Sequence, residues 1–391
     1  RYPATADDKE NFYVNDRGQV LRVGVAQLDF GDSDLDWEYA REISLLKSRS
    51  SRYPIKVRDA TEWGLLADTI PFWIDVDLAE QEGVKTNDAT DEFVEAINAQ
   101  LARSNNKHVY IYTHGYRVIF ENPILITAEL WHFLGYDGAF IAYAWPSTPS
   151  RWAYIKDSDT SDGYARNFRL LVETIAKNTD VEEIHIMGYS NGTRLVSRAM
   201  EQLALTRQGK TREENLEELK ISNVMLFGSD LDAGVFGSYV ADGLTDVTRR
   251  VTVYLSRHDK ALGFSRFVSQ RQRLGQLWGS PDAVHPQARH ALKAFEDRIT
   301  YINVSDAEGA NTGNGHGYFR SSPWVSSDLL MTLRYGLDPL ERGLIEQEDL
   351  PVYTFPPDYI TRLWSSIKEA DPVFAAAYQE LRASKVADAR P

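Results

Sequence analysis

The sequence predicts an α/β fold in which helices cover both faces of a mostly parallel β-sheet. Between residues 109 and 335, short apolar segments typical of buried strands alternate with longer segments whose apolar residues recur at helical spacing. Strands that alternate with helices favour a parallel sheet joined by crossover helices. The chain has 391 residues, of which 43% are hydrophobic, and this is enough for one large core.

Three regions of one structural domain follow from the pattern. Residues 1–100 form an N-terminal extension that supplies edge strands of the sheet, at 11–14 and 21–26, and a helix within 87–104. Residues 101–336 form the core. Its predicted strands are 109–112, 140–144, 184–187, 224–227, 251–255 and 299–304, and its main helices are 124–134, 164–177, 191–205, 264–277 and 325–335. Residues 146–163 and 206–220 are polar connectors, the second of them a solvated helix or loop. Residues 337–391 are an appended C-terminal arm with an amphipathic segment at 359–367.

Composition excludes several classes of protein. The formal net charge is −14 and no run of Lys and Arg occurs, so nucleic acid and anionic membranes are not expected partners. There is no cysteine, which excludes disulfides and cysteine-based zinc sites. The sequence contains no run of about 18 apolar residues, so no transmembrane segment is predicted. Because the chain starts with Arg1 rather than Met, we expect an exported protein, periplasmic or lipoprotein, whose targeting segment has been removed.

The residues Gly188-Tyr189-Ser190-Asn191-Gly192 form a G-x-S-x-G pattern. The pattern alone is weak, but it directly follows a predicted buried strand and opens a predicted helix. This strand–turn–helix setting is the one that a nucleophile elbow requires, and it is typical of the α/β-hydrolase fold. The sharp turn exposes the serine hydroxyl and directs the first amides of the helix toward the group under attack. Ser190 is therefore the predicted nucleophile.

A serine nucleophile requires a histidine base and an acid that orients it. In this fold the acid and then the histidine follow the nucleophile, each in a loop after a strand. Asp259 follows strand 251–255, and His316 follows the last strand between glycines. Asp230 follows the preceding strand and is the alternative acid. His258, His285 and His290 are poorer bases, since His258 follows the wrong strand and the other two precede the last one.

Two backbone amides are expected to form the oxyanion hole. One belongs to Asn191, directly after the nucleophile, and the other to Tyr116, in the loop Thr113-His114-Gly115-Tyr116 after the first core strand. His114 is expected to tie this loop down rather than to react.

Other features carry less weight. Trp145 and Trp152 are candidates for lining a substrate cleft or packing in the core. The acidic run 32–36 resembles the start of a calcium loop, but Trp37 stands where glycine is required and Ile43 where the bidentate Glu is required. We therefore expect no metal site and no cofactor.

With these motifs the chain resembles a family of bacterial α/β hydrolases catalogued as a domain of unknown function. The resemblance covers roughly residues 10–335. It is carried by Phe12–Arg17, Tyr112–Tyr116 with Phe120 and Glu121, Phe140–Ser147, His185–Arg194, Asp230–Asp232, Tyr254–Leu262 and Gly315–Phe319. Asn191 stands where this family often has Met, which is tolerable because only the backbone amide acts there. The resemblance implies the fold and a hydrolytic triad, and no substrate; members often resemble exported proteins.

The sequence thus predicts a serine hydrolase, with a carboxylic ester as the first choice of small-molecule substrate. An amidase or peptidase would use the same residues. The alternative from a different class is a catalytically silent scaffold that acts as a binding protein, because a fold does not guarantee a function. The sequence predicts no oligomeric state.

Overall fold

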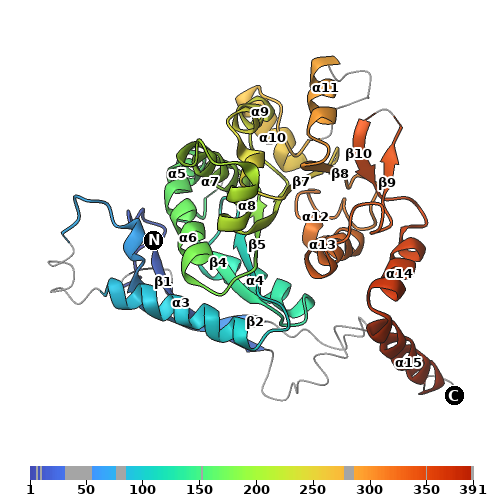
Figure 1. Ribbon diagram of the computed structural model, residues 1–391, viewed down its shortest axis with the longest axis horizontal. Coiled ribbons are helices and arrows are strands. Elements are labelled where there is room, and N and C mark those ends of the chain that lie inside the picture. The colour runs from blue at the N-terminus through green and yellow to red at the C-terminus, as the bar shows by residue number, and fades with distance from the viewer. Residues whose placement is uncertain are drawn as a thin grey trace.

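A computed structural model describes residues 1–5, 8, 11–30, 55–75, 85–150, 153–276, 286–348 and 350–388. Within these residues, eight strands form one sheet in the order β4-β3-β5-β6-β7-β8-β10-β9 (Figure 1). The strands are β3 His108–Thr113, β4 Ala139–Tyr143, β5 Glu183–Tyr189, β6 Ile221–Phe227, β7 Arg250–Leu255, β8 Ile299–Asn303, β9 Ile345–Gln347 and β10 Leu350–Thr354. All neighbours are parallel except β9 and β10.

Helices cover both faces of this sheet, as the sequence predicts. The helices are α3 Asn87–Ala102, α4 Glu121–Phe133, α5 Tyr154–Gly163, α6 Ala165–Asn178, α7 Gly192–Thr206, α8 Arg212–Leu219, α9 Ala233–Ala241, α10 Lys260–Ser269, α11 Pro286–Ala294, α12 Tyr318–Ser321, α13 Pro323–Tyr335, α14 Tyr359–Ala370 and α15 Pro372–Asp388. Successive strand residues point to opposite faces. Ile111 and Val253 therefore pack with α6 and α7, whereas Tyr112 and Tyr254 pack with α13.

The N-terminal strands were predicted as edges of the main sheet, and this prediction is wrong. Strand β1 (Arg22–Phe30) pairs with β2 (Ile55–Leu65) as a separate antiparallel sheet. Residues 11–14 form no strand, although Tyr13 makes a single bridge to Pro3. The two strands bury only part of one face, against α3, so they form a ribbon beside the β4 side of the core (Figure 1).

A helix lies in the connector 146–163, where none was predicted, and another lies in 206–220, where a solvated helix or a loop was predicted. Helix α5 occupies residues 154–163, and α8 begins with a capping box in which Thr211 and Glu214 cap each other's backbone amides. Helix α10 begins at Lys260 rather than at 264, because the Asp259 side chain caps its first turn.

The C-terminal arm is not merely appended, because β9 and β10 extend the main sheet beyond β8. A buried ion pair also joins this segment to the core. The Arg342 guanidinium donates to the Asp328 carboxylate from Nε at 2.6 Å, and the Tyr254 hydroxyl donates to the other carboxylate oxygen at 2.8 Å. Helices α14 and α15 then lead away from the sheet to the C-terminus (Figure 1). Among the described helices, none has the length and apolarity needed to cross a bilayer.

The Arg342–Asp328 pair gives a test of this attachment. Both side chains are at most 2% exposed, so replacing Arg342 with alanine leaves an uncompensated buried carboxylate. We expect a loss of about 3–5 kcal/mol in the free energy of unfolding, measured by urea denaturation. The control is Arg362→Ala, which removes an exposed pair with Asp358 and should cost at most about 1 kcal/mol. If both variants lost the same free energy of unfolding, the buried pair would not be what joins the C-terminal segment to the core.

Candidate active site

The turn between β5 and α7 has the backbone that a nucleophile elbow requires. Ser190 adopts φ 53°, a left-handed conformation that costs a non-glycine residue energy. Its amide donates to the carbonyl of Phe227 at 2.9 Å, which ties the elbow to the end of β6. Gly192 is required by close approach, because a Cβ there would lie 2.5 Å from the carbonyl oxygen of His114. The strained serine is thus held by backbone contacts on both sides.

The loops after β7 and β8 bring Asp259 and His316 together. Nδ1 of His316 lies 2.6 Å from Oδ2 of Asp259, and both side chains are buried. The other carboxylate oxygen, Oδ1, accepts the amide of Leu262 at 2.9 Å and so caps α10. The two loops are joined directly, since the Lys260 amide donates to the Asn314 carbonyl at 3.0 Å. The carboxylate is therefore fixed by a helix cap on one side and orients the imidazole on the other.

The His316 ring lies beside the elbow. It contacts the ring of Tyr189, the residue before Ser190, with centroids 4.9 Å apart. A Cβ on Gly228, the residue after Phe227, would lie 2.8 Å from Cε1 of His316. The outer nitrogen, Nε2, is buried and has no hydrogen-bond partner within the part of the chain that the structure describes. When Nδ1 carries the ring proton and donates it to Asp259, Nε2 has a lone pair that can accept a proton.

Asp230, the alternative acid, faces elsewhere. Its carboxylate accepts the hydroxyl of Tyr154 at 2.7 Å and the hydroxyl of Ser265, and it lies 3.7 Å from Nε of Arg273. Asp230 is 2% exposed and Arg273 is 4% exposed, so this is a buried ion pair. Of the two candidate acids, the structure places Asp259 and not Asp230 against His316.

The loop after β3 packs against Ser190. A Cβ on Gly115 would lie 2.7 Å from Cβ and 3.2 Å from Oγ of Ser190, so only glycine allows this approach. Tyr116 follows directly, and its ring packs against that of Tyr154. Asn191 is fully buried at the first turn of α7, where its side chain contacts the Ser158 hydroxyl at 3.4 Å. The two predicted oxyanion residues therefore belong to the two segments that flank Ser190.

His114 holds this loop, as the sequence predicts. Its ring stacks on the indole of Trp145 with centroids 5.0 Å apart, and its nitrogens lie 2.7 Å and 3.1 Å from the carbonyl oxygens of Gly115 and Trp145. The indole Nε1 in turn donates to the His114 carbonyl at 2.7 Å. Trp145 is 1% exposed, so it packs in the core and does not line a cleft. Trp152, residues 32–36 and His285 lie outside the described residues.

Burial of His114 predicts an acid-sensitive fold. Burial lowers the pKa of His114 from 6.5 to about 3, so between these values the unfolded chain binds a proton that the folded chain does not. The contribution of neutral His114 to the free energy of unfolding is complete above pH 6.5 and is lost as the pH falls toward 3. The free energy of unfolding should fall about 1.4 kcal/mol per pH unit more steeply in the wild type than in His114→Gln, measured by urea denaturation at several pH values. If the free energy of unfolding fell equally with pH in the wild type and in His114→Gln, the prediction would be wrong.

A pocket that the sequence did not predict lies beside the elbow. It has a volume of about 330 Å³ and is lined by Ile126, Glu129, Tyr189, Gly317, Phe319, Arg320 and Ser321. Two of these residues, Tyr189 and Gly317, are chain neighbours of Ser190 and His316. Arg320 donates to Glu129 at 2.8 Å, which places an ion pair in the lining. The sequence signal was the segment 317–321, directly after the histidine, which supplies four of the lining residues.

The fold and this geometry define a class: an α/β hydrolase with a serine at its elbow and a buried histidine–aspartate pair beside it. Comparison with known families agrees. Residues 89–334 match the family described as alpha/beta hydrolase of unknown function, DUF900, and the chain belongs to that family. No match was found among curated proteins.

Proposed function

We propose that this chain is a serine-dependent hydrolase of carboxylic esters, in which Ser190 is the nucleophile, His316 the general base and Asp259 the orienting acid. One observation carries the proposal. The 2.6 Å contact of His316 Nδ1 with Asp259 leaves a buried, unpartnered Nε2 on a ring beside the strained elbow. A base oriented in this way takes a proton at Nε2.

The reaction has two halves. Nε2 of His316 takes the proton of the Ser190 hydroxyl as Oγ attacks the acyl carbon, and the oxyanion binds the amides of Asn191 and Tyr116. The bond to the alcohol oxygen breaks, and His316 returns the proton to the leaving alcohol. Water then attacks the acyl-serine, loses a proton to His316, and releases the acid while Ser190 regains its proton. The sum is ester plus water to acid plus alcohol, and no metal or organic cofactor takes part.

The size of the pocket favours substrates with short acyl or alcohol groups. Its volume of about 330 Å³ is near the lower end of ligand pockets, which is about 300 Å³. Phe319, Tyr189 and Ile126 supply apolar surface, while the Arg320–Glu129 pair adds a polar contact. We therefore expect p-nitrophenyl acetate and butyrate to be better substrates than the palmitate.

The proposal is tested by labelling and by a substrate panel. A fluorophosphonate probe should label the wild type and should not label Ser190→Ala. p-Nitrophenyl esters of increasing acyl length then measure kcat/KM, and the matching p-nitroanilides distinguish an amidase. A chain that neither reacts with the probe nor turns over any ester would be a silent scaffold, and the proposal would be wrong.

A further inference from the structure

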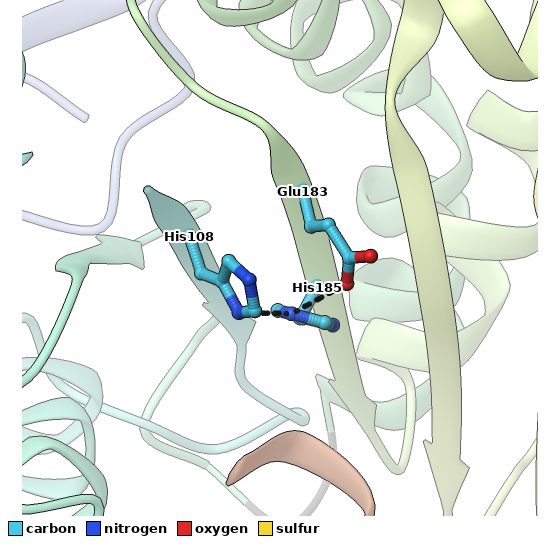
Figure 2. Close-up of side chains that lie close together, drawn as sticks. All are labelled: His108, Glu183 and His185. Carbon is cyan, nitrogen blue, oxygen red and sulfur yellow. Dashed lines mark hydrogen bonds and ion pairs between the residues drawn. The ribbon is translucent and has the colours of Figure 1, made fainter. Parts of the chain in front are cut away.

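Two histidines and a glutamate meet at the end of the sheet opposite the elbow. His108 begins β3 and Glu183 begins β5, whereas Ser190 follows the carboxyl end of β5. Figure 2 shows the His108 and His185 rings meeting between the two strands, with the Glu183 carboxylate beside His185. These residues play no part in the proposed ester hydrolysis.

Strand geometry explains why the three side chains share one face. Residues two apart on a strand point the same way, so Glu183 and His185 lie on the same face of β5. In the parallel register, His108 is the partner of Glu183, and Tyr110 is the partner of His185. The two neighbouring strands therefore present all three groups together. The sequence signal was Glu-x-His at the start of one strand and a histidine at the start of another.

The distances suit one cation. Nε2 of His185 lies 3.1 Å from Nδ1 of His108 and 3.6 Å from Oε2 of Glu183, and the three atoms all lie within 4.8 Å of one another. Tetrahedral zinc with bonds of 2.0–2.2 Å to nitrogen and oxygen separates its ligand atoms by about 3.3–3.6 Å. Small side-chain rotations would thus bring the three atoms to one ion.

Further groups hold these side chains in place. Asn223 on β6 contacts Nδ1 of His185 at 3.0 Å, and the Tyr110 ring stacks on the His185 ring at 4.9 Å. Arg249 donates to Oε1 of Glu183 at 3.1 Å, which leaves Oε2 facing His185. Outer partners of this kind orient metal ligands. With an ion on Nε2, Nδ1 of His185 would carry the proton and donate to the Asn223 amide oxygen after rotation of that amide.

The charges around the cluster favour a cation. The negative charges of three carboxylates, those of Glu183, Glu182 and Asp137, favour a positive charge at His108. The opposing charge is Arg249, whose side chain is 65% exposed and pairs with Glu183.

We propose that His108, His185 and Glu183 bind a divalent transition metal of the zinc type, which clips β3 to β5. Imidazole ligands favour zinc and its neighbours over calcium or magnesium. Three protein ligands leave a fourth tetrahedral position for water, on the side where His108 and Glu183 are partly exposed. Because the cluster lies at the opposite end of β5 from Ser190, the ion takes no part in the proposed ester hydrolysis.

The test is zinc binding by the full chain. After treatment with a chelator, the protein is titrated with Zn²⁺ by calorimetry, and Co²⁺ reports coordination geometry by its visible absorption. The test variants are His108→Gln and Glu183→Gln, which alter the partly exposed ligands and spare the buried His185. We expect zinc affinity to fall by at least about 10–100-fold in each, since even outer-shell changes have effects of that size. The matched control, His290→Gln on α11, removes an exposed histidine and should change the affinity less than twofold.

Melting curves give a second readout. Zn²⁺ should raise the melting temperature of the wild type and of His290→Gln, and it should not raise that of Glu183→Gln. Two results would overturn the proposal. One is the absence of zinc binding to the wild type at about 100 μM Zn²⁺, which would show that the cluster is only a hydrogen-bonded pair of histidines. The other is unchanged affinity in both test variants, which would place the ion elsewhere.

Discussion

Replacing Ser190 with alanine is expected to abolish ester turnover while the protein stays folded. Loss of a triad nucleophile lowers kcat by about 10⁶-fold, because the acyl-enzyme can no longer form. The backbone of the elbow is held by the Phe227 carbonyl and by Gly192, and neither contact uses the serine hydroxyl. Steady-state kinetics with a p-nitrophenyl ester measure the loss, and circular dichroism measures folding.

The matched control for this variant, Ser197, lies in α7, the helix that follows the elbow. Ser197 is also buried, and its hydroxyl has no hydrogen-bond partner among the described residues. Ser197→Ala therefore removes a similar group from the helix that follows the elbow, and activity should stay within about twofold of the wild type, as expected for a substitution outside the known destabilising mechanisms. If Ser190→Ala kept more than a few per cent of wild-type activity, Ser190 would not be the nucleophile.

The second large effect is expected from Asp259→Asn. The new amide can still accept the Leu262 amide through its oxygen and so keep the cap of α10, but its NH₂ group then faces Nδ1 of His316. That contact favours the tautomer with the proton on Nε2, which cannot act as a base. The same change in the serine protease triad lowers kcat by about 10⁴-fold, and we expect a loss of that order here.

Asp230→Asn is the comparison, because it alters the other acid near the elbow. Asp230 contacts Tyr154, Ser265 and Arg273 rather than His316. The substitution should therefore lower kcat by about tenfold, through local packing, while removal of a buried charge opposite Arg273 should cost about 3–5 kcal/mol of stability. Activity and melting temperature of both variants decide between the acids. A larger loss of kcat in Asp230→Asn than in Asp259→Asn would move the acid to the earlier strand.

The main sheet was predictable from the sequence because its signals are local. Each central strand is a short apolar run buried on both faces, and each long helix has its apolar residues at helical spacing. The elbow is equally local, since Gly188, Ser190 and Gly192 lie within five residues of one another. The loop Thr113–Tyr116 was predictable for the same reason. In each case, the residues that make the feature are neighbours in the chain.

Tertiary structure decided the rest, because those features depend on contacts between distant segments. The sequence left Asp259 and Asp230 open as acids, and only the packing of the loops after β7 and β8 brings Asp259 within 2.6 Å of His316, 57 residues away. Pairing of β1 with β2, and of β10 with β8, depends on which strand edges remain free after the core forms. The cluster of His108, Glu183 and His185 likewise requires the register of two strands about 75 residues apart, whereas the residues of the elbow motif lie within five positions of the chain.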